Sequence, residues 1–237
     1  ETYPLYAFLH FIDPELLRTR LLESCFYLHI QPPLFNLFCG VILKAFGSAS
    51  DSVFRVIYVL LGFALYVSVF FLMLRLGVRR WLALVLSTLF MASSAFILYE
   101  HWLFYTLPSA LLLVISALCL HRMVVSGGYW AAVGFFGSLF MLAGIRSSYH
   151  ISYFVVVLIA TVAVCAGFRK RMLSVGLVFL VLVVGMNAKN YALFGFFGTS
   201  SLLGKNMYIN TVGNMRYEDR ERLARKGKLS ELALYNR

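Results

Sequence analysis

Six long apolar runs between residues 53 and 186 constrain this chain more than any other feature of its sequence. Each run lies within or near the window of roughly 17–25 residues that a helix needs to cross a bilayer. The sequence therefore predicts an all-α polytopic membrane protein. Its expected spans are Val53–Leu76, Trp81–Leu98, Leu103–Leu120, Tyr129–Ile145, Ile151–Phe168 and Met172–Met186.

The composition excludes an ordinary soluble domain. Hydrophobic residues make up 61% of the 237 residues and charged residues only 13%, whereas soluble domains carry about 25% charged residues. The four cysteines are scattered without metal or redox spacing, so we interpret them as packing residues. They are Cys25, Cys39, Cys119 and Cys165.

The charge of the short connections predicts the orientation of the bundle. Seven basic residues lie at the ends of the first, third and fifth runs or in the connections that follow them. The short connections after the second and fourth runs contain only one basic residue, Arg146. The seven are Arg75, Arg79, Arg80, Arg122, Arg169, Lys170 and Arg171. Basic turns of this kind face the cytoplasm. All ten acidic residues lie on the other side of the predicted bundle, so the net charge of +11 reflects orientation rather than nucleic-acid binding.

Six spans return the chain to its starting side, which defines three regions. Residues 1–50 form an expected extracytoplasmic loop with juxtamembrane helices, and residues 51–190 form the six-span bundle. Residues 191–237 form a second extracytoplasmic loop, with an amphipathic helix expected over 216–235. We expect a multi-pass integral protein of the bacterial inner membrane or an equivalent membrane, and, because the chain begins at Glu1 rather than Met, a piece of a longer protein.

Two segments before the first run have the pattern of juxtamembrane helices. Residues 13–28 begin with Asp13 at an N-cap and Pro14 at the first helical position, and their alternating leucines and charges suit a membrane interface. Residues 32–47, "PPLFNLFCGVILKAFG", are apolar but short for a span. We interpret them as a second juxtamembrane helix; the alternative is a short seventh span.

Four stretches resemble a known family. They are "ETYPLYAF" at 1–8, "PPLFNLF" at 32–38, residues 51–77 and "YEHWLFYTLPSALLLVISALCLHR" at 99–122. Together they resemble the N-terminal half of GT-C glycosyltransferases, in the branch of protein O-mannosyltransferases and the lipid A aminoarabinose transferase. The resemblance implies a GT-C-like helical bundle that lacks the family's first span and C-terminal part. It also implies a polyprenyl- or dolichyl-phosphate sugar donor, an extracytoplasmic active site and inverting transfer to a protein, lipid or polysaccharide.

Sugar transfer from a lipid phosphate needs a base for the acceptor and cations or donors for the leaving phosphate. The candidate catalytic carboxylates are Glu1, which best fills the family's acidic position, and Glu100. Asp13 competes with Glu1, although helix capping explains it. Glu100 stands at a membrane boundary beside His101 and Trp102, where an acid is typically functional; alternatively, it only marks the water interface beside a belt tryptophan.

The candidate substrate-binding residues are His29, Gln31, His101, Arg146, Lys189 and Lys205. Arg146 ends the fourth run and could bind phosphate, or its side chain could extend to the interface. Lys189 and Lys205 flank a Gly/Ser/Thr-rich stretch that could cradle a phosphate, or that could form a re-entrant loop. His29 and Gln31 precede Pro32, where the resemblance implies a polar residue near the donor.

The same residues give less support to other functional classes. The histidines form no HxxH or HxD cluster, so no metal or other cofactor is expected. A transporter or flippase for lipid-linked sugars would need ionisable residues within its spans, which are almost absent here. A non-catalytic membrane subunit remains an alternative, and in such a subunit loss of Glu100 would have no effect on activity.

Overall fold

The computed structural model describes residues 11–202, 208–230 and 234. All of the secondary structure in these residues is helical. The chain divides into two compact units, Glu1–Thr199 and Ser200–Arg237, and each is described by itself. The expected all-α class is therefore confirmed for the described part of the chain.

Three helical stretches of the first unit are long and apolar enough to cross a membrane. Two are single helices, α8 (Thr106–Ser126) and α11 (Arg169–Phe194). The third is the 42-residue stretch Leu34–Arg75, in which a short 3-10 turn joins α4 (Leu34–Phe46) to α5 (Ser50–Arg75). These helices support the expected multi-pass membrane character.

The remaining apolar runs form shorter or broken helices. The second run divides into α6 (Arg80–Met91) and α7 (Ser94–Glu100), which are bent by 64° and could together make a fourth span. Helices α9 (Tyr129–Ile145) and α10 (Ile151–Val164) have 17 and 14 residues. At 1.5 Å per residue they are about 26 and 21 Å long, short of a core of about 30 Å. The six expected spans are thus three long helical stretches, one bent pair and two shorter apolar helices.

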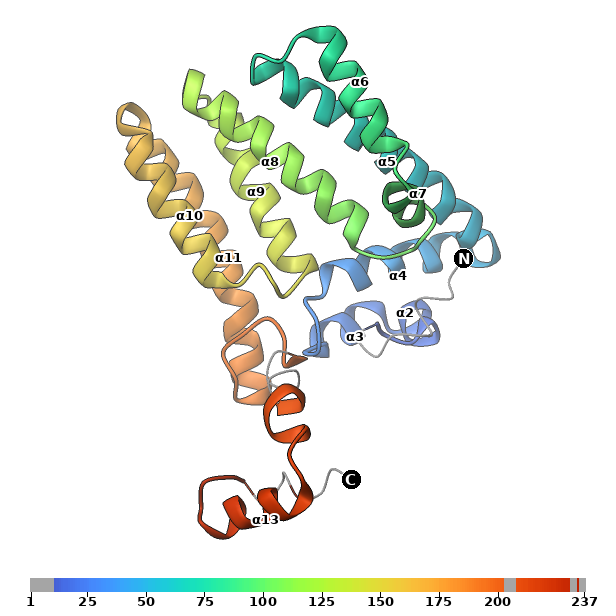
Figure 1. The fold of residues 1–237 in the computed structure, drawn as a ribbon, viewed down its shortest axis with the longest axis vertical. Helices are drawn as coiled ribbons and strands as arrows, with labels where there is room; N and C mark the ends of the chain where they lie inside the picture. Colours follow the sequence, from blue (N-terminus) through green and yellow to red (C-terminus); the bar gives the residue numbers. More distant parts are fainter. Residues whose placement is uncertain (1–10, 203–207, 231–233, 235–237) are drawn as a thin grey trace. The chain divides into compact units, whose positions relative to one another are not determined.

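The two ends of this helical layer carry different connections. In Figure 1 the turns between α5 and α6, α8 and α9, and α10 and α11 lie at one end, and α4 runs along the other. At the first end Arg171 Nη1 donates to the Gly127 carbonyl oxygen. At the second end Leu34 packs directly on Gly144. The basic turns therefore lie away from the end that carries Glu100 and Arg146.

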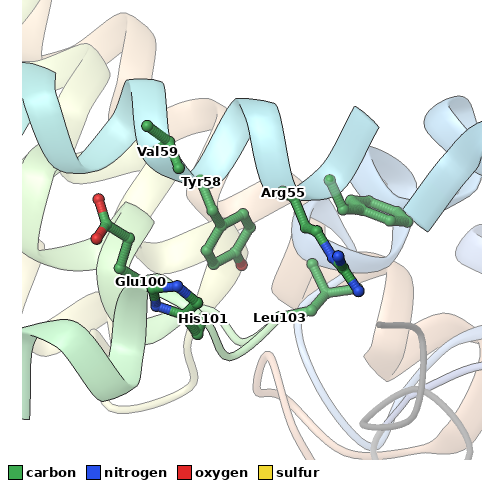
Figure 2. A pocket seen from close by; sticks show the side chains of 7 residues that line it. Arg55, Tyr58, Val59, Glu100, His101 and Leu103 are labelled. Atoms are coloured by element: carbon green, nitrogen blue, oxygen red, sulfur yellow. The ribbon is translucent and has the colours of Figure 1, made fainter. Parts of the chain in front are cut away.

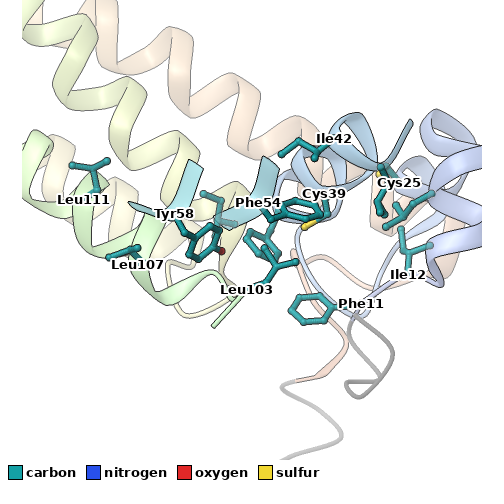
Figure 3. Packing of buried hydrophobic residues seen from close by; sticks show 14 of the residues in the cluster. Phe11, Ile12, Cys25, Cys39, Ile42, Phe54, Tyr58, Leu103, Leu107 and Leu111 are labelled. Carbon is teal, nitrogen blue, oxygen red and sulfur yellow. The ribbon is translucent and has the colours of Figure 1, made fainter. Parts of the chain in front are cut away.

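Two clusters of buried side chains hold the first unit together. One joins α4, α5, α7 and α8 with the segment before α4, and Figure 3 shows its residues Phe54, Tyr58 and Leu107. The other joins α8 through α11 around Phe136, Leu142 and other apolar residues. Many large apolar side chains elsewhere on the long helices are exposed, as expected for helices that face lipid.

The segment before α4 forms two short helices rather than one. They are α2 (Pro14–Thr19) and α3 (Leu21–Tyr27). The expected cap is confirmed, because Asp13 accepts a hydrogen bond from the Glu15 amide at 2.8 Å. The expected continuous helix is wrong because Arg20 leaves the helical conformation, with φ −129° and ψ 47°.

In the second unit the expected helix over 216–235 is shorter than predicted. Helix α13 covers Tyr217–Arg225 and includes two exposed ion pairs. Its end is explained by Gly227, which has a φ of +65°. This left-handed conformation favours glycine and stops a helix.

Candidate functional site

A cavity of about 510 Å³ lies between α5 and the segment that joins α7 to α8. Figure 2 shows Arg55, Tyr58 and Val59 of α5 on one side of it and Glu100, His101 and Leu103 on the other. Its lining combines one acid, one guanidinium group, an imidazole and a phenol with apolar side chains. The lining residues are Phe54, Arg55, Tyr58, Val59, Glu100, His101 and Leu103.

Helix α5 supplies one wall of this cavity. Arg55 and Tyr58 are three residues apart and therefore lie on one face of the helix, with Gly62 one turn beyond Tyr58. Tyr58 is buried, and its hydroxyl donates to the Phe104 carbonyl oxygen at 2.6 Å. This bond ties the α7–α8 connection to α5.

The end of α7 forms the opposite wall. It can reach this position because the second apolar run is broken between α6 and α7. Small residues follow α6, and Ser93 begins α7 as its N-cap, accepting from the Phe96 amide at 3.3 Å. The bend turns the last residue of α7, Glu100, toward α5. There the carboxylate packs so closely on Gly62 that a methyl group on Gly62 would overlap Glu100 Oε1.

Glu100 and Arg55 lie at different ends of the cavity. Gly62, which Glu100 contacts, is seven residues along α5 from Arg55, a separation of about 10 Å at the helical rise of ~1.5 Å per residue. Glu100 forms no ion pair with any described residue. The site can therefore present a carboxylate to one part of a ligand and a guanidinium group to another.

His101 has a defined tautomer beside Glu100. Its Nδ1 lies 2.9 Å from the Ile97 carbonyl oxygen, which can only accept, so Nδ1 carries the proton. In the neutral ring Nε2 is then the acceptor. The imidazole is exposed, and it can accept a hydrogen bond from a ligand in the cavity.

Arg146 lies outside the cavity lining. Its guanidinium group stands over the Tyr105 ring, with Cζ 5.6 Å from the ring centre, a distance suited to a cation–π contact. Burial raises the pKa of Tyr105, and the positive charge of Arg146 partly opposes this. Tyr105 also packs edge-on against Phe35 of α4, so Arg146 supports the packing of Tyr105 against α4.

Lys189 belongs to a second, mainly apolar cavity of about 240 Å³ between α3, α4 and α11. Its ammonium group donates to the carbonyl oxygens of Phe26 at 2.7 Å and Leu28 at 3.1 Å. These carbonyls are at the C-terminal end of α3, where a cation is favourable. In the same cavity burial raises the pKa of the Cys25 thiol to about 11, which makes it unreactive at neutral pH.

The other predicted residues do not join the first cavity. His29 lies against Phe194, with ring centres 4.5 Å apart. Gln31 is buried, and its Oε1 has no hydrogen-bond partner among the described residues. Glu1 and Lys205 lie outside the described residues. Of the predicted site residues that the structure describes, Glu100 and His101 line the first cavity. The others, Arg146, Lys189, His29 and Gln31, do not.

Sequence reasoning missed Arg55 and Tyr58 as site residues. The available signal was an arginine in the opening turns of an otherwise apolar run, followed three residues later by a tyrosine. Ionisable residues within membrane helices are usually functional. The position of Gly62 opposite Glu100 left no such signal, because it depends on how α7 packs on α5.

Within the described part of the chain, no group of three or more His, Cys, Asp or Glu side chains could hold a metal ion. Comparison with protein-family models, with curated proteins and with solved structures gave no match.

Proposed function

We propose that this chain is a GT-C-type membrane glycosyltransferase that transfers a sugar from a polyprenyl- or dolichyl-phosphate donor to an extracytoplasmic acceptor. The observation that carries the proposal is the cavity in which Glu100 and Arg55 occupy different ends. The resemblance of residues 51–77 and 99–122 to that family supports the same reading, because these stretches supply both walls of the cavity.

Glu100 is the proposed base. It takes the proton of the acceptor hydroxyl as the acceptor oxygen forms a bond to the anomeric carbon. The bond from that carbon to the phosphate oxygen breaks, and the lipid phosphate leaves with the electron pair. A single displacement of this kind inverts the anomeric configuration, as the family resemblance implies.

Arg55 is the proposed partner of the leaving phosphate. A guanidinium group can bind two phosphate oxygens at once, and it stabilises the negative charge that develops as the bond breaks. His101 lines the cavity, and its Nε2 is the proposed acceptor of a hydrogen bond that orients the sugar. Arg146 lies outside the cavity lining and supports the Tyr105 ring.

The outer flank of α5 offers a path for the isoprenoid chain. Val59 lines the cavity and is 53% exposed, and the neighbouring apolar residues Val56, Leu60 and Phe63 are also exposed. The isoprenoid chain of the donor could lie along this flank and place its phosphate in the cavity while it stays in the hydrocarbon core of the bilayer.

Transfer from a radiolabelled polyprenyl-phosphate sugar tests the proposal with the full chain in proteoliposomes. Glu100→Gln keeps the size of the side chain but removes the base, so we expect a loss of about 100- to 10,000-fold. Glu23→Gln is the matched control, because Glu23 forms only an exposed 3.9 Å ion pair with Arg20. Unchanged transfer by the Glu100 variant would contradict the assignment and would favour a non-catalytic subunit.

A further inference from the structure

The contact between Gly62 and Glu100 gives α5 a role beyond packing. The last residue of α7 could have pointed its carboxylate into solvent, yet it lies against the backbone of α5 at a buried glycine. A Cβ at this position would overlap Glu100 Oε1 and would also lie 3.2 Å from Phe96 Cζ. The carboxylate can occupy its place only because residue 62 has no side chain.

We infer that Gly62 is a positioning residue, which sets the location of the Glu100 carboxylate in the cavity. Its consequence for catalysis rests on the proposed function, whereas the positioning itself rests on the contact alone. Gly62 occupies the face of α5 that also presents Tyr58, and Tyr58 holds the Phe104 carbonyl oxygen. One helical face thus fixes both the carboxylate and the connection that follows it.

The substitution Gly62→Ala tests this directly. The added methyl group must displace the Glu100 carboxylate, and a displacement of about 1 Å in an active site can cost about 100-fold in rate. We expect transfer to fall by about 100-fold and the melting temperature to fall by about 3 °C. Gly185→Ala in α11 is the matched control, because a Cβ there meets nothing within 4 Å. It is expected to leave transfer unchanged and to raise the melting temperature slightly, because alanine favours a helix more than glycine does.

A second substitution separates positioning from general damage to packing. Glu100→Asp shortens the side chain by one methylene and makes room for the methyl group. If the two substitutions acted independently, their losses in transfer rate would multiply in the double variant. We expect the Gly62→Ala, Glu100→Asp double variant to transfer sugar at least about tenfold faster than that product. The melting temperature should recover by at least half. Recovery stays partial because Phe96 must still move.

Two further backgrounds complete the cycle. Gly62→Ala should remain harmful to the melting temperature beside Glu100→Gln, which has the same length. Beside Glu100→Ala it should lower the melting temperature by less than half as much, because only the Phe96 contact remains. An effect of equal size in every background would overturn the inference. If the melting temperatures are coupled in this way but the unmodified chain transfers no sugar, the positioning contact stands and the proposed function fails.

Discussion

At the scale of single residues, Tyr58 joins the buried core to the candidate site. Its ring packs in the first core cluster, and its hydroxyl donates to the Phe104 carbonyl oxygen at 2.6 Å. Sequence alone could place Tyr58 on an apolar helix but could not supply this partner, which is 46 residues away. The same is true of Gly62 and Glu100, whose proximity depends on tertiary packing rather than on spacing in the chain.

Tyr58→Phe should destabilise the first unit without changing its helices. The substitution removes one buried hydrogen bond to the Phe104 carbonyl oxygen, and such a loss costs about 0.5–1.5 kcal/mol in the free energy of unfolding. Tyr66→Phe is the control on the same helix, because the Tyr66 hydroxyl makes only an exposed 3.4 Å contact with Thr88. Denaturant unfolding in detergent measures both; losses of equal size would contradict the importance of the buried bond.

At the scale of elements, the apolar runs predicted the helices but not their breaks. The second run reads as one continuous span, yet Ser93 can cap a new helix because its hydroxyl satisfies the Phe96 amide. That local alternative turns α7 by 64° from α6 and brings Glu100 to α5. The end of α2 at Arg20 is a second break that the sequence pattern did not predict. The pattern of leucines and charges favoured one continuous helix. Packing of Leu17 and Leu21 against Gly40 on α4 favours two short helices instead.

Helix α3 gives a prediction at this scale, because it depends on a residue from α11. Lys189→Met keeps the length of the side chain but removes the ammonium group from the Phe26 and Leu28 carbonyl oxygens. We expect α3 to be less stable by about 1 kcal/mol and its amides to exchange with solvent about fivefold faster. Lys228→Met, in the second unit, is the control for hydrogen exchange. Unchanged exchange in α3 would show that Lys189 does not cap it.

At the scale of the whole molecule, the sequence predicted a helical membrane protein whose basic connections lie together on one side. Basic turns lie at one end of the first unit, and the end along α4 carries the cavity. Candidate residues chosen for charge alone proved less predictable, because a partly exposed cation has several possible partners. The Arg146 guanidinium group lies over an aromatic ring, and the Lys189 ammonium group donates to backbone carbonyl oxygens. Arg55 lines the cavity.

The central claim is that a polyprenyl-phosphate sugar binds in the Glu100 cavity, with its chain along α5. The most direct measurement replaces Val59 by benzoylphenylalanine and cross-links it to a radiolabelled donor in proteoliposomes. Val181 on α11 is the control position, since it is exposed and apolar as well. The account predicts at least about tenfold more cross-linking at position 59, and competition by unlabelled donor. Equal labelling at both positions would contradict it.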